Sequence, residues 1–296
     1  MRLPNGKFAA IKADGNAGRC YVDPYVGSAS CVAEACRNIV AVGAEPIAML
    51  DHCQFGDPNN PEVFWTFVQT MRGIADTCKK FSLPCIGGKV SFYNEDTETR
   101  TAIKPTPVIV VVGLIDRQNQ ITTSGLKREG DSIIVVGKTK KDLRGSEYYR
   151  LSDASNGTPP SIDLGLEKRT LDAVLESIKR GYVKSCHDVS KGGLAIAFAE
   201  MCIEGNIGAT IDLKKTQNAK LGDDEILFSE SNARFILSTK REKDVLKFFS
   251  KRRIPTAKVG EVKGDRLEIV TRNNTVTCAL QDMKAAYSKS IERLVE

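Results

Sequence analysis

The distribution of apolar and polar positions along the chain predicts strands and helices that alternate. Residues 8–15 (FAAIKADG) and 106–115 (TPVIVVVGLI) are typical of strands, and the second is apolar enough to be a central one. Apolar residues at helical spacing predict helices within residues 27–46 and 60–81. Residues 19–25 (RCYVDPY) predict a further short strand.

Residues with special backbone preferences indicate where these helices begin and end. Ser28 or Ser30 is expected to cap the first helix, and Gly43 and Pro46 are expected to end it. Pro61 suits the first turn of the second helix because its fixed φ is already helical. Two more strands are predicted at residues 47–55 (IAMLDHCQF) and 84–93 (PCIGGKVSFY).

The second half repeats the alternation after a polar, turn-rich stretch. Residues 117–125 have no hydrophobic period and predict a linker. We therefore expect an α/β (α+β) fold with two domains, residues 1–118 and residues 126–296. The elements predicted in the second domain are strand 132–138, helix 167–182, a strand and a helix within 184–205, strand 233–240, helix 241–252 and strand 266–270.

The composition of the chain excludes several classes of protein. Its 296 residues, 41% of them hydrophobic and 27% charged, are typical of a globular protein. The longest apolar run, residues 108–115, is much shorter than the roughly 18–20 residues of a membrane helix. Residues 1–15 lack the apolar core of a signal peptide, so we expect a cytoplasmic protein without a membrane partner. The net charge of +6 is spread over short basic runs without interleaved aromatic residues, which favours a solvated face over nucleic-acid binding.

Nine cysteines are scattered along the chain, with no CxxC pair. An odd number with apolar neighbours predicts reduced thiols in the core and argues against a disulfide framework. Zinc binding is not expected from two histidines without paired spacing.

The stretch LPCIGGKVSFYNED, residues 83–96, resembles a phosphate-binding loop but fails the test for a Walker loop. That motif needs a glycine where Leu83 stands and a serine directly after the lysine, whereas Ser91 comes two residues after Lys89. On local pattern alone we favour a Gly-Gly bulge at the start of a strand. The alternative is a site where the backbone approaches a ligand and Lys89 and Ser91 donate hydrogen bonds.

Three other polar clusters stand at the ends of predicted elements. One follows an apolar strand, where open α/β folds bind ligands, and one precedes a Gly-Gly that opens a helix, where an anion would be stabilised. Each alone is adequately explained by capping or turn formation, and a nucleophilic triad is not supported because there is no GxSxG. The clusters are Asp51, His52 and Gln54; His187, Asp188, Ser190 and Lys191; and Glu230 and Ser231.

Seven segments in order resemble one family. The resemblance is to the second half of the phosphoribosylformylglycinamidine synthases, of the aminoimidazole ribonucleotide synthetase superfamily, and it extends from about Lys12 to about Val270. The segments are DPYVGSASCVAEACRNIVAVGAEPIAM, DHCQFGDPNNPEVFW, GGKVSFYNE, KPTPVIVVVG, LRGSEYY, HDVSKGGL and LFSES.

The resemblance implies a fold and a reaction. In that family two tandem copies of a two-domain unit occur, the first domains pair through their sheets into a barrel-like core, and each second domain is an α/β sandwich. ATP phosphorylates the amide oxygen of formylglycinamide ribonucleotide, and ammonia from a glutaminase subunit displaces the phosphate to form the amidine.

Site residues follow from the resemblance by position. Asp51 and Gly88 correspond to ATP-contacting residues, and Ser91 corresponds to a residue that contacts the ribonucleotide. ATP and Mg²⁺ are the implied cofactors. Lys89 stands where the family has a magnesium-associated asparagine, and a charged lysine cannot ligate a metal, so its ammonium is expected to neutralise a phosphate instead.

No catalytic residue is expected in this chain. The family's catalytic histidine lies in an SHNHPS-type loop of the first copy, and the corresponding residues here contain no histidine. The chain is therefore expected to be a second copy, either an excised half or a separately encoded subunit, and inactive alone. The expected partners are the first-copy half, the glutaminase subunit, the ribonucleotide and, when the chain is isolated, a second copy of itself.

Two alternatives remain open. The first alternative is a non-catalytic scaffold that carries an auxiliary nucleotide site and stabilises the synthetase. A free-standing relative, such as a thiamine-monophosphate kinase or a selenophosphate synthetase, is less compatible with the GGKVSFYNE and DPYVGSA segments.

Overall fold

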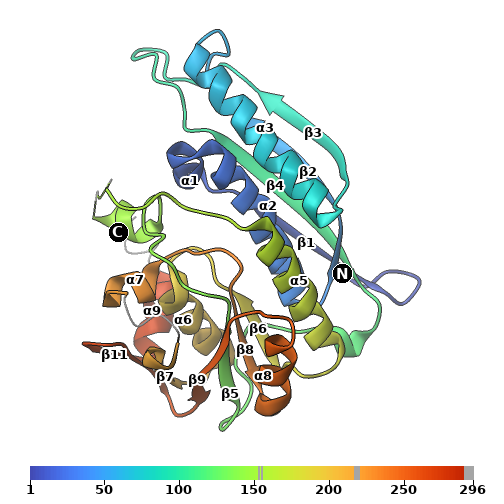
Figure 1. The fold of residues 1–296 in the computed structure, drawn as a ribbon, viewed down its shortest axis with the longest axis vertical. Coiled ribbons are helices and arrows are strands. Elements are labelled where there is room, and N and C mark those ends of the chain that lie inside the picture. Colours follow the sequence, from blue (N-terminus) through green and yellow to red (C-terminus); the bar gives the residue numbers. More distant parts are fainter. Residues whose placement is uncertain (153, 155, 217–220, 290–296) are drawn as a thin grey trace.

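The chain forms two β-sheets that are covered by helices (Figure 1). The computed structural model describes residues 1–152, 154, 156–216 and 221–289. One sheet has four strands in the order β1-β4-β2-β3, and the other has seven in the order β11-β10-β7-β9-β5-β8-β6. This is the mixed α/β architecture that the alternating pattern predicts.

The first sheet contains every strand predicted in the first domain apart from residues 19–25. β4 lies between β1 and β2, which confirms the prediction of a central strand, and it pairs with both in antiparallel fashion, whereas β2 and β3 are parallel. The strands are β1 (Phe8–Asp14), β2 (Glu45–Gln54), β3 (Cys85–Ser91) and β4 (Thr106–Ile115).

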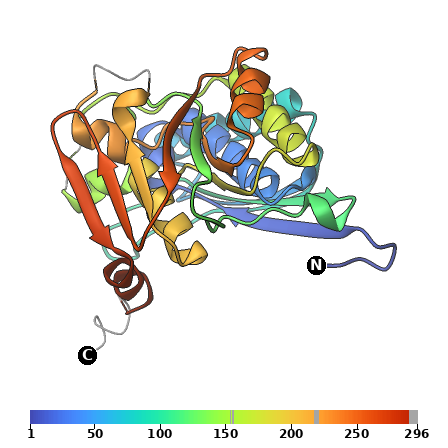
Figure 2. The ribbon, with the colours of Figure 1, turned by 90° about the horizontal axis from the view of Figure 1, so that it is seen from below.

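Helices cover one face of this sheet, as the view from below shows (Figure 2). They are α1 (Ala17–Val22), α2 (Pro24–Ala41) and α3 (Pro61–Phe81). The sheet's opposite face is apolar and partly open to solvent. There Ile11 is 66% exposed, and its neighbours Val110 and Val112 on β4 are half-buried.

Two predictions at the start of the chain are wrong. Residues 19–25 do not form a strand, because Asn16 caps the short helix α1 and Asp23 then caps α2 by accepting a hydrogen bond from the Val26 amide. Ser28 is therefore inside α2 rather than at its end, and its hydroxyl donates to the Thr70 carbonyl of α3 at 3.0 Å. An aspartate followed by proline begins a helix efficiently, because the carboxylate accepts from the free amides and proline lacks an amide to satisfy.

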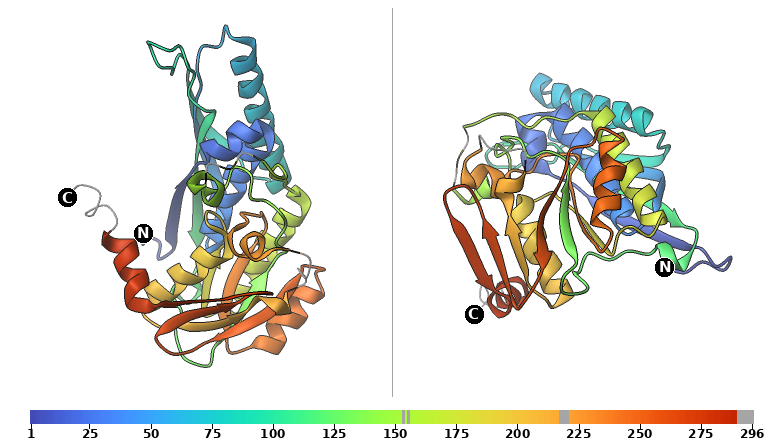
Figure 3. Two further views of the ribbon diagram at one scale, coloured as in Figure 1. Left: turned by 90° about the vertical axis from the view of Figure 1, so that its left-hand side faces the viewer. Right: turned by 60° about the horizontal axis from the view of Figure 1, so that its bottom comes forward.

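The second sheet lies between two layers of helices. Alternate residues of β5 point to opposite faces: Ile134 and Val136 belong to the core under α5 and α8, and Ile133 and Val135 to the core under α6. This is the predicted sandwich. Figure 3 shows β11 and α9 at the far edge of the sheet, away from α3. The strands are β5 (Ser132–Val136), β6 (Ser185–Asp188), β7 (Ala209–Asp212), β8 (Phe235–Thr239), β9 (Thr256–Val262), β10 (Arg266–Val270) and β11 (Thr275–Ala279), and the helices are α4 (Glu147–Leu151), α5 (Leu164–Lys179), α6 (Gly193–Gly205), α7 (Asp223–Phe228), α8 (Glu242–Ser250) and α9 (Leu280–Lys289).

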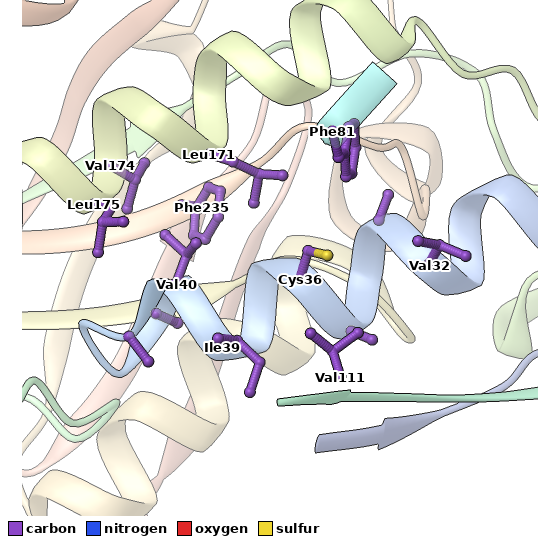
Figure 4. Packing of buried hydrophobic residues seen from close by; sticks show 14 of the residues in the cluster. Val32, Cys36, Ile39, Val40, Phe81, Val111, Leu171, Val174, Leu175 and Phe235 are labelled. Carbon is purple, nitrogen blue, oxygen red and sulfur yellow. The ribbon is translucent and has the colours of Figure 1, made fainter. Parts of the chain in front are cut away.

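One continuous core joins the two sheets. α2 lies between β4 and α5, so that Ile39 and Val40 of α2 contact the same apolar cluster as Leu171 and Val174 of α5 (Figure 4). The segment between the sheets is bound to both sides, since the Thr122 amide donates to the Val42 carbonyl after α2, and the Cys186 amide of β6 donates to the Thr123 carbonyl, each at 3.2 Å. The domain division at residues 118 and 126 stays a prediction.

The nine cysteines are all free in the structure. Six are buried and Cys78 is half-buried, as expected of core thiols, but Cys85 and Cys278 are exposed. No helix among the described residues is long and apolar enough to cross a membrane.

Candidate functional site

The residues predicted to contact ATP and the ribonucleotide lie side by side on β2 and β3. The parallel register pairs Asp51 with Gly88, and two residues further pairs Cys53 with Val90. The remaining polar positions alternate with these, so that the neighbouring cross-strand pairs are His52 with Lys89 and Gln54 with Ser91.

This alternation divides the site between the two faces of the sheet. Asp51 is paired with the buried Ile109 of β4, so the Asp51 side chain lies on the face covered by helices, and the Cα of Gly88 beside it is on the same side. Lys89 and Ser91 belong to the opposite, partly open face. The structure therefore brings Asp51 to Gly88 but separates that pair from the side chains of Lys89 and Ser91.

A side chain at position 88 would displace this carboxylate from its place. A Cβ atom built on Gly88 would lie 2.5 Å from Asp51 Oδ1, closer than real contacts allow. Because Gly88 has no side chain, the Asp51 carboxylate lies directly against β3, and the backbone of Gly88 is open to solvent. The interpretation that a ligand can approach the backbone here is compatible with this geometry.

Glu230 of the LFSES segment ties two other segments together. Its Oε1 accepts hydrogen bonds from the amides of Glu147 (2.9 Å) and Gly192 (3.0 Å), at the starts of α4 and α6. Burial raises the pKa of Glu230, and the charge of Arg19 opposes that shift. Ser231 accepts a hydrogen bond from the Lys140 amide at 2.9 Å. Both residues thus organise loops, as capping and turn chemistry would.

His187 is held by carboxylates. Its Nε2 lies 3.2 Å from Glu200 Oε2. Burial acts to lower the pKa of His187, but the hydrogen bond to Glu200 and the charge of Asp188 outweigh burial and raise the pKa to about 9. The imidazole is therefore protonated at neutral pH and is unsuited to act as a general base.

Asp188, next to it, is buried and accepts a hydrogen bond from Asn38 Nδ2 at 3.2 Å. Burial raises its pKa. Because Asn38 belongs to α2 and Asp188 to β6, this contact joins the helical layer of the first sheet to the second sheet. Lys191 makes a similar connection, donating from Nζ to the Gly15 carbonyl at 3.1 Å.

A cavity of about 590 Å³ lies between the loop that precedes α1 and the segment Arg144–Arg150. Four cationic side chains line it: Lys104, Arg144, Arg150 and Lys191. Among the described lining residues, Arg150 is the one of these that is paired with a carboxylate of the cavity, Glu147 at 2.7 Å. The net positive lining is suited to an anionic ligand. Neither Asp51 nor Gly88 lines this cavity, so it is a second region, separate from the β2–β3 pair.

No pattern in the sequence predicts the buried charges between the helices of the two sheets. Arg37 and Glu167 form an ion pair there, and Arg19 is 2% exposed with two guanidinium nitrogens that have no hydrogen-bond partner among the described residues. Burial and the Glu34 carboxylate raise the pKa of Asp14 to about 7. These residues stand within helix-forming or strand-forming patterns, where a single charged residue is usually solvated.

Two family models match the chain in succession. Residues 1–115 match the N-terminal domain of AIR synthase related proteins, and residues 128–272 match the C-terminal domain. The chain belongs to the AIR synthase related family. The resemblance at the level of the superfamily is thereby confirmed.

Curated proteins that are similar to this chain carry the name phosphoribosylformylglycinamidine synthase subunit PurL. That of Thermococcus sibiricus is 44% identical over 239 residues, which are 80% of this chain and 33% of the relative. That of Methanocaldococcus jannaschii is 38% identical over 294 residues, which are 97% of this chain and 40% of the relative. The chain thus spans less than half the length of these relatives.

Solved structures share the fold. Thermotoga maritima PurL complexed with FGAR superposes with a TM-score of 0.81 at 23% identity, covering 94% of this chain and 46% of that one. The same protein complexed with ATP gives a TM-score of 0.77 at 24% identity, covering 96% and 45%. The hydrogenase maturation protein HypE gives 0.69 at 14% identity, covering 92% and 88%. The two-sheet unit is therefore a shared fold, which makes up most of HypE and less than half of PurL.

Proposed function

We propose that this chain supplies the second copy of the repeated unit in a phosphoribosylformylglycinamidine synthase. The whole enzyme would convert formylglycinamide ribonucleotide to the amidine in purine biosynthesis, with ATP and with ammonia from a glutaminase subunit. The observation that carries the proposal is the 38% identity to a PurL subunit over 97% of the chain. A match of that length includes every segment on which the site depends.

The β2–β3 pair would contribute to the nucleotide and substrate site. Asp51 and the open backbone of Gly88 would contact ATP on the helix-covered side, and the Ser91 hydroxyl would contact the ribonucleotide from the other side. Lys89 is exposed and would place an ammonium charge near a phosphate.

The described residues do not form a complete protein site for magnesium. Among the described residues no group of three or more histidine, cysteine, aspartate or glutamate side chains could hold a metal ion. Lys89 offers no lone pair while charged. Any Mg²⁺ at the β2–β3 site would need ligands from the nucleotide or from another chain.

An auxiliary nucleotide site is the second candidate function, and the cationic cavity beside α4 favours it. The cavity of about 590 Å³ is in the size range of small-molecule sites and is lined by Arg144 and Lys191 as well as by the aromatic ring of Tyr21. In this alternative the chain binds a nucleotide away from Asp51 and stabilises the complex without taking part in the reaction.

The test is an assay of amidine formation with ammonia as nitrogen donor. The 296-residue chain alone is expected to be inactive, and addition of a first-copy half should restore activity. Turnover by the chain alone, above a heat-inactivated control, would contradict the role of a second copy. Calorimetric titration of ATP and ADP, with magnesium and with a chelator, then separates the two candidates. Loss of binding in Arg144→Ala but not in Asp51→Ala would favour the auxiliary site.

A further inference from the structure

The Asp51 carboxylate lies between two thiols. Cys53 Sγ is 3.4 Å from Asp51 Oδ2, and Cys85 Sγ is 3.5 Å from Oδ1, both within hydrogen-bonding range for sulfur. Cys53 belongs to β2 and Cys85 to β3, so the carboxylate is bound from both strands. The Cys85 thiol is also 3.4 Å from the Gly87 carbonyl, which places it at the start of the Gly-Gly segment.

Both thiols are protonated at neutral pH and can therefore donate. Burial and the charge of Asp51 raise the pKa of Cys53. Burial also raises the pKa of Cys85, and the carboxylate adds to that shift. Because a thiolate would repel the carboxylate, the contacts persist only while both cysteines keep their protons.

The remaining side of the carboxylate is bounded by Gly88. Asp51 Oδ1 occupies the space that a Cβ atom at position 88 would need. The Cys53 thiol donates to one carboxylate oxygen, and the single proton of the Cys85 thiol is shared between the other oxygen and the Gly87 carbonyl. Together with the missing side chain at position 88, these contacts restrict the orientation of Asp51 more than any one of them would alone.

We propose that Cys53 and Cys85 are positioning residues, which orient Asp51 for the nucleotide at the β2–β3 site. This rests on the proposed function, in which Asp51 contacts ATP. Cys53 is buried and acts from within the sheet, whereas Cys85 is exposed and is accessible to reagents from solvent. The reactivity of the exposed Cys85 thiol therefore reports whether a charged Asp51 side chain lies beside it.

The first experiment needs no nucleotide. Alkylation of Cys85 by iodoacetamide is followed by peptide mass spectrometry in the native chain and in Asp51→Asn. Removal of the negative charge should increase the thiolate fraction of Cys85 and accelerate its alkylation about threefold or more. Cys278, which is exposed and distant in sequence from the site, serves as the internal control and should react at one rate in both proteins.

The second experiment measures ADP affinity by calorimetry. Loss of one weak hydrogen bond to Asp51, in Cys53→Ala or Cys85→Ala, should weaken ADP binding by about threefold to tenfold. Cys85→Ser should restore affinity, since its hydroxyl also donates, and Cys278→Ala should leave affinity unchanged. If the thiols served packing alone, the alanine variants would have a lower melting temperature, and Cys85→Ser would not restore ADP affinity.

The outcomes separate this inference from the proposed function. Equal alkylation rates in the native chain and Asp51→Asn overturn the positioning role. Unchanged ADP affinity in both alanine variants, in a chain that binds ADP, overturns it as well. Absence of ADP binding by the native chain overturns the nucleotide site itself, and the positioning role fails with it.

Discussion

Arg37 Nη1 donates a hydrogen bond to Glu167 Oε1 at 2.7 Å, and the two side chains are only 1% and 0% exposed. Arg37 lies on α2 beneath the first sheet, and Glu167 lies in the first turn of α5, beside the second sheet. Arg37 Nε and Glu167 Oε2 have no further hydrogen-bond partner among the described residues. Arg37 Nη2 also lies 4.0 Å from Glu34 Oε2 on the same helix, whereas Arg37 is the one ion-pair partner of Glu167 among the described residues. The Glu167 charge therefore depends on Arg37, and the pair fixes α2 against α5.

Removal of one member of this pair should destabilise the chain strongly. Arg37→Met leaves a buried, unpaired carboxylate and is expected to reduce the free energy of unfolding by about 3–5 kcal/mol. Denaturant titration at fixed protein concentration measures this free energy of unfolding. Arg180→Met is the matched control, because Arg180 forms an exposed pair with Glu176 of α5 and should cost at most about 1 kcal/mol. Similar losses in both variants would contradict a special role for the buried pair.

Asp51→Ala should weaken adenine nucleotide binding. Loss of a partly buried polar partner costs on the order of 1–3 kcal/mol, which is roughly a 5-fold to 150-fold increase in Kd. Isothermal titration of ATP and ADP measures the change. Asp172→Ala, which removes an exposed aspartate of α5, should leave the affinity as it is. Unchanged affinity in Asp51→Ala would mean that the nucleotide contact has been assigned to the wrong residue.

The open face of the first sheet should pair with a second copy when the chain is isolated. Several hundred Å² of apolar surface, more than soluble monomers usually expose, would be covered by a two-fold contact. Light scattering at micromolar concentration should give twice the chain mass of 32.4 kDa.

The variant Ile11→Lys tests which face is used, because Ile11 is 66% exposed on that sheet. It should dissociate the dimer, whereas Val276→Lys, on the edge strand β11 of the second sheet, should not. A native chain that is a stable monomer, or a dimer that only Val276→Lys dissociates, would refute the prediction.

The stability of the chain should fall with rising pH because of His187. Its pKa is 6.5 when unperturbed and about 9 in the folded chain, so between these values the folded state holds a proton that the unfolded state has released. The contribution is complete below pH 6.5 and is lost as the pH rises through 9. Unfolding titrations should show a steeper loss over this window in the native chain than in His187→Gln.

The predicted elements correspond well to the structure where a hydrophobic period extends over many residues. α3, β4 and α5 lie where the apolar pattern predicts them. Each of these helices buries one stripe of its surface and the strand buries one face, so the buried residues recur with the period of the element. The pattern predicts a strand at residues 19–25, where the structure has the end of α1 and the start of α2. Over six residues the two periods cannot be distinguished, and the caps at Asn16 and Asp23 decide. Short segments depend on local hydrogen bonds more than on periodicity.

The amino-acid sequence by itself determined the type of most elements and the family, and it predicts the residues of the candidate site, because these depend on residue identity and spacing. It did not determine which site residues act together. The register of β2 against β3 places Asp51 with Gly88 and turns Lys89 and Ser91 to the other face, since side chains alternate along a strand. Likewise, only the packing of α2 on α5 brings Arg37 to Glu167, 130 residues apart in the chain. Contacts of that separation depend on how whole elements pack, and no local pattern encodes them.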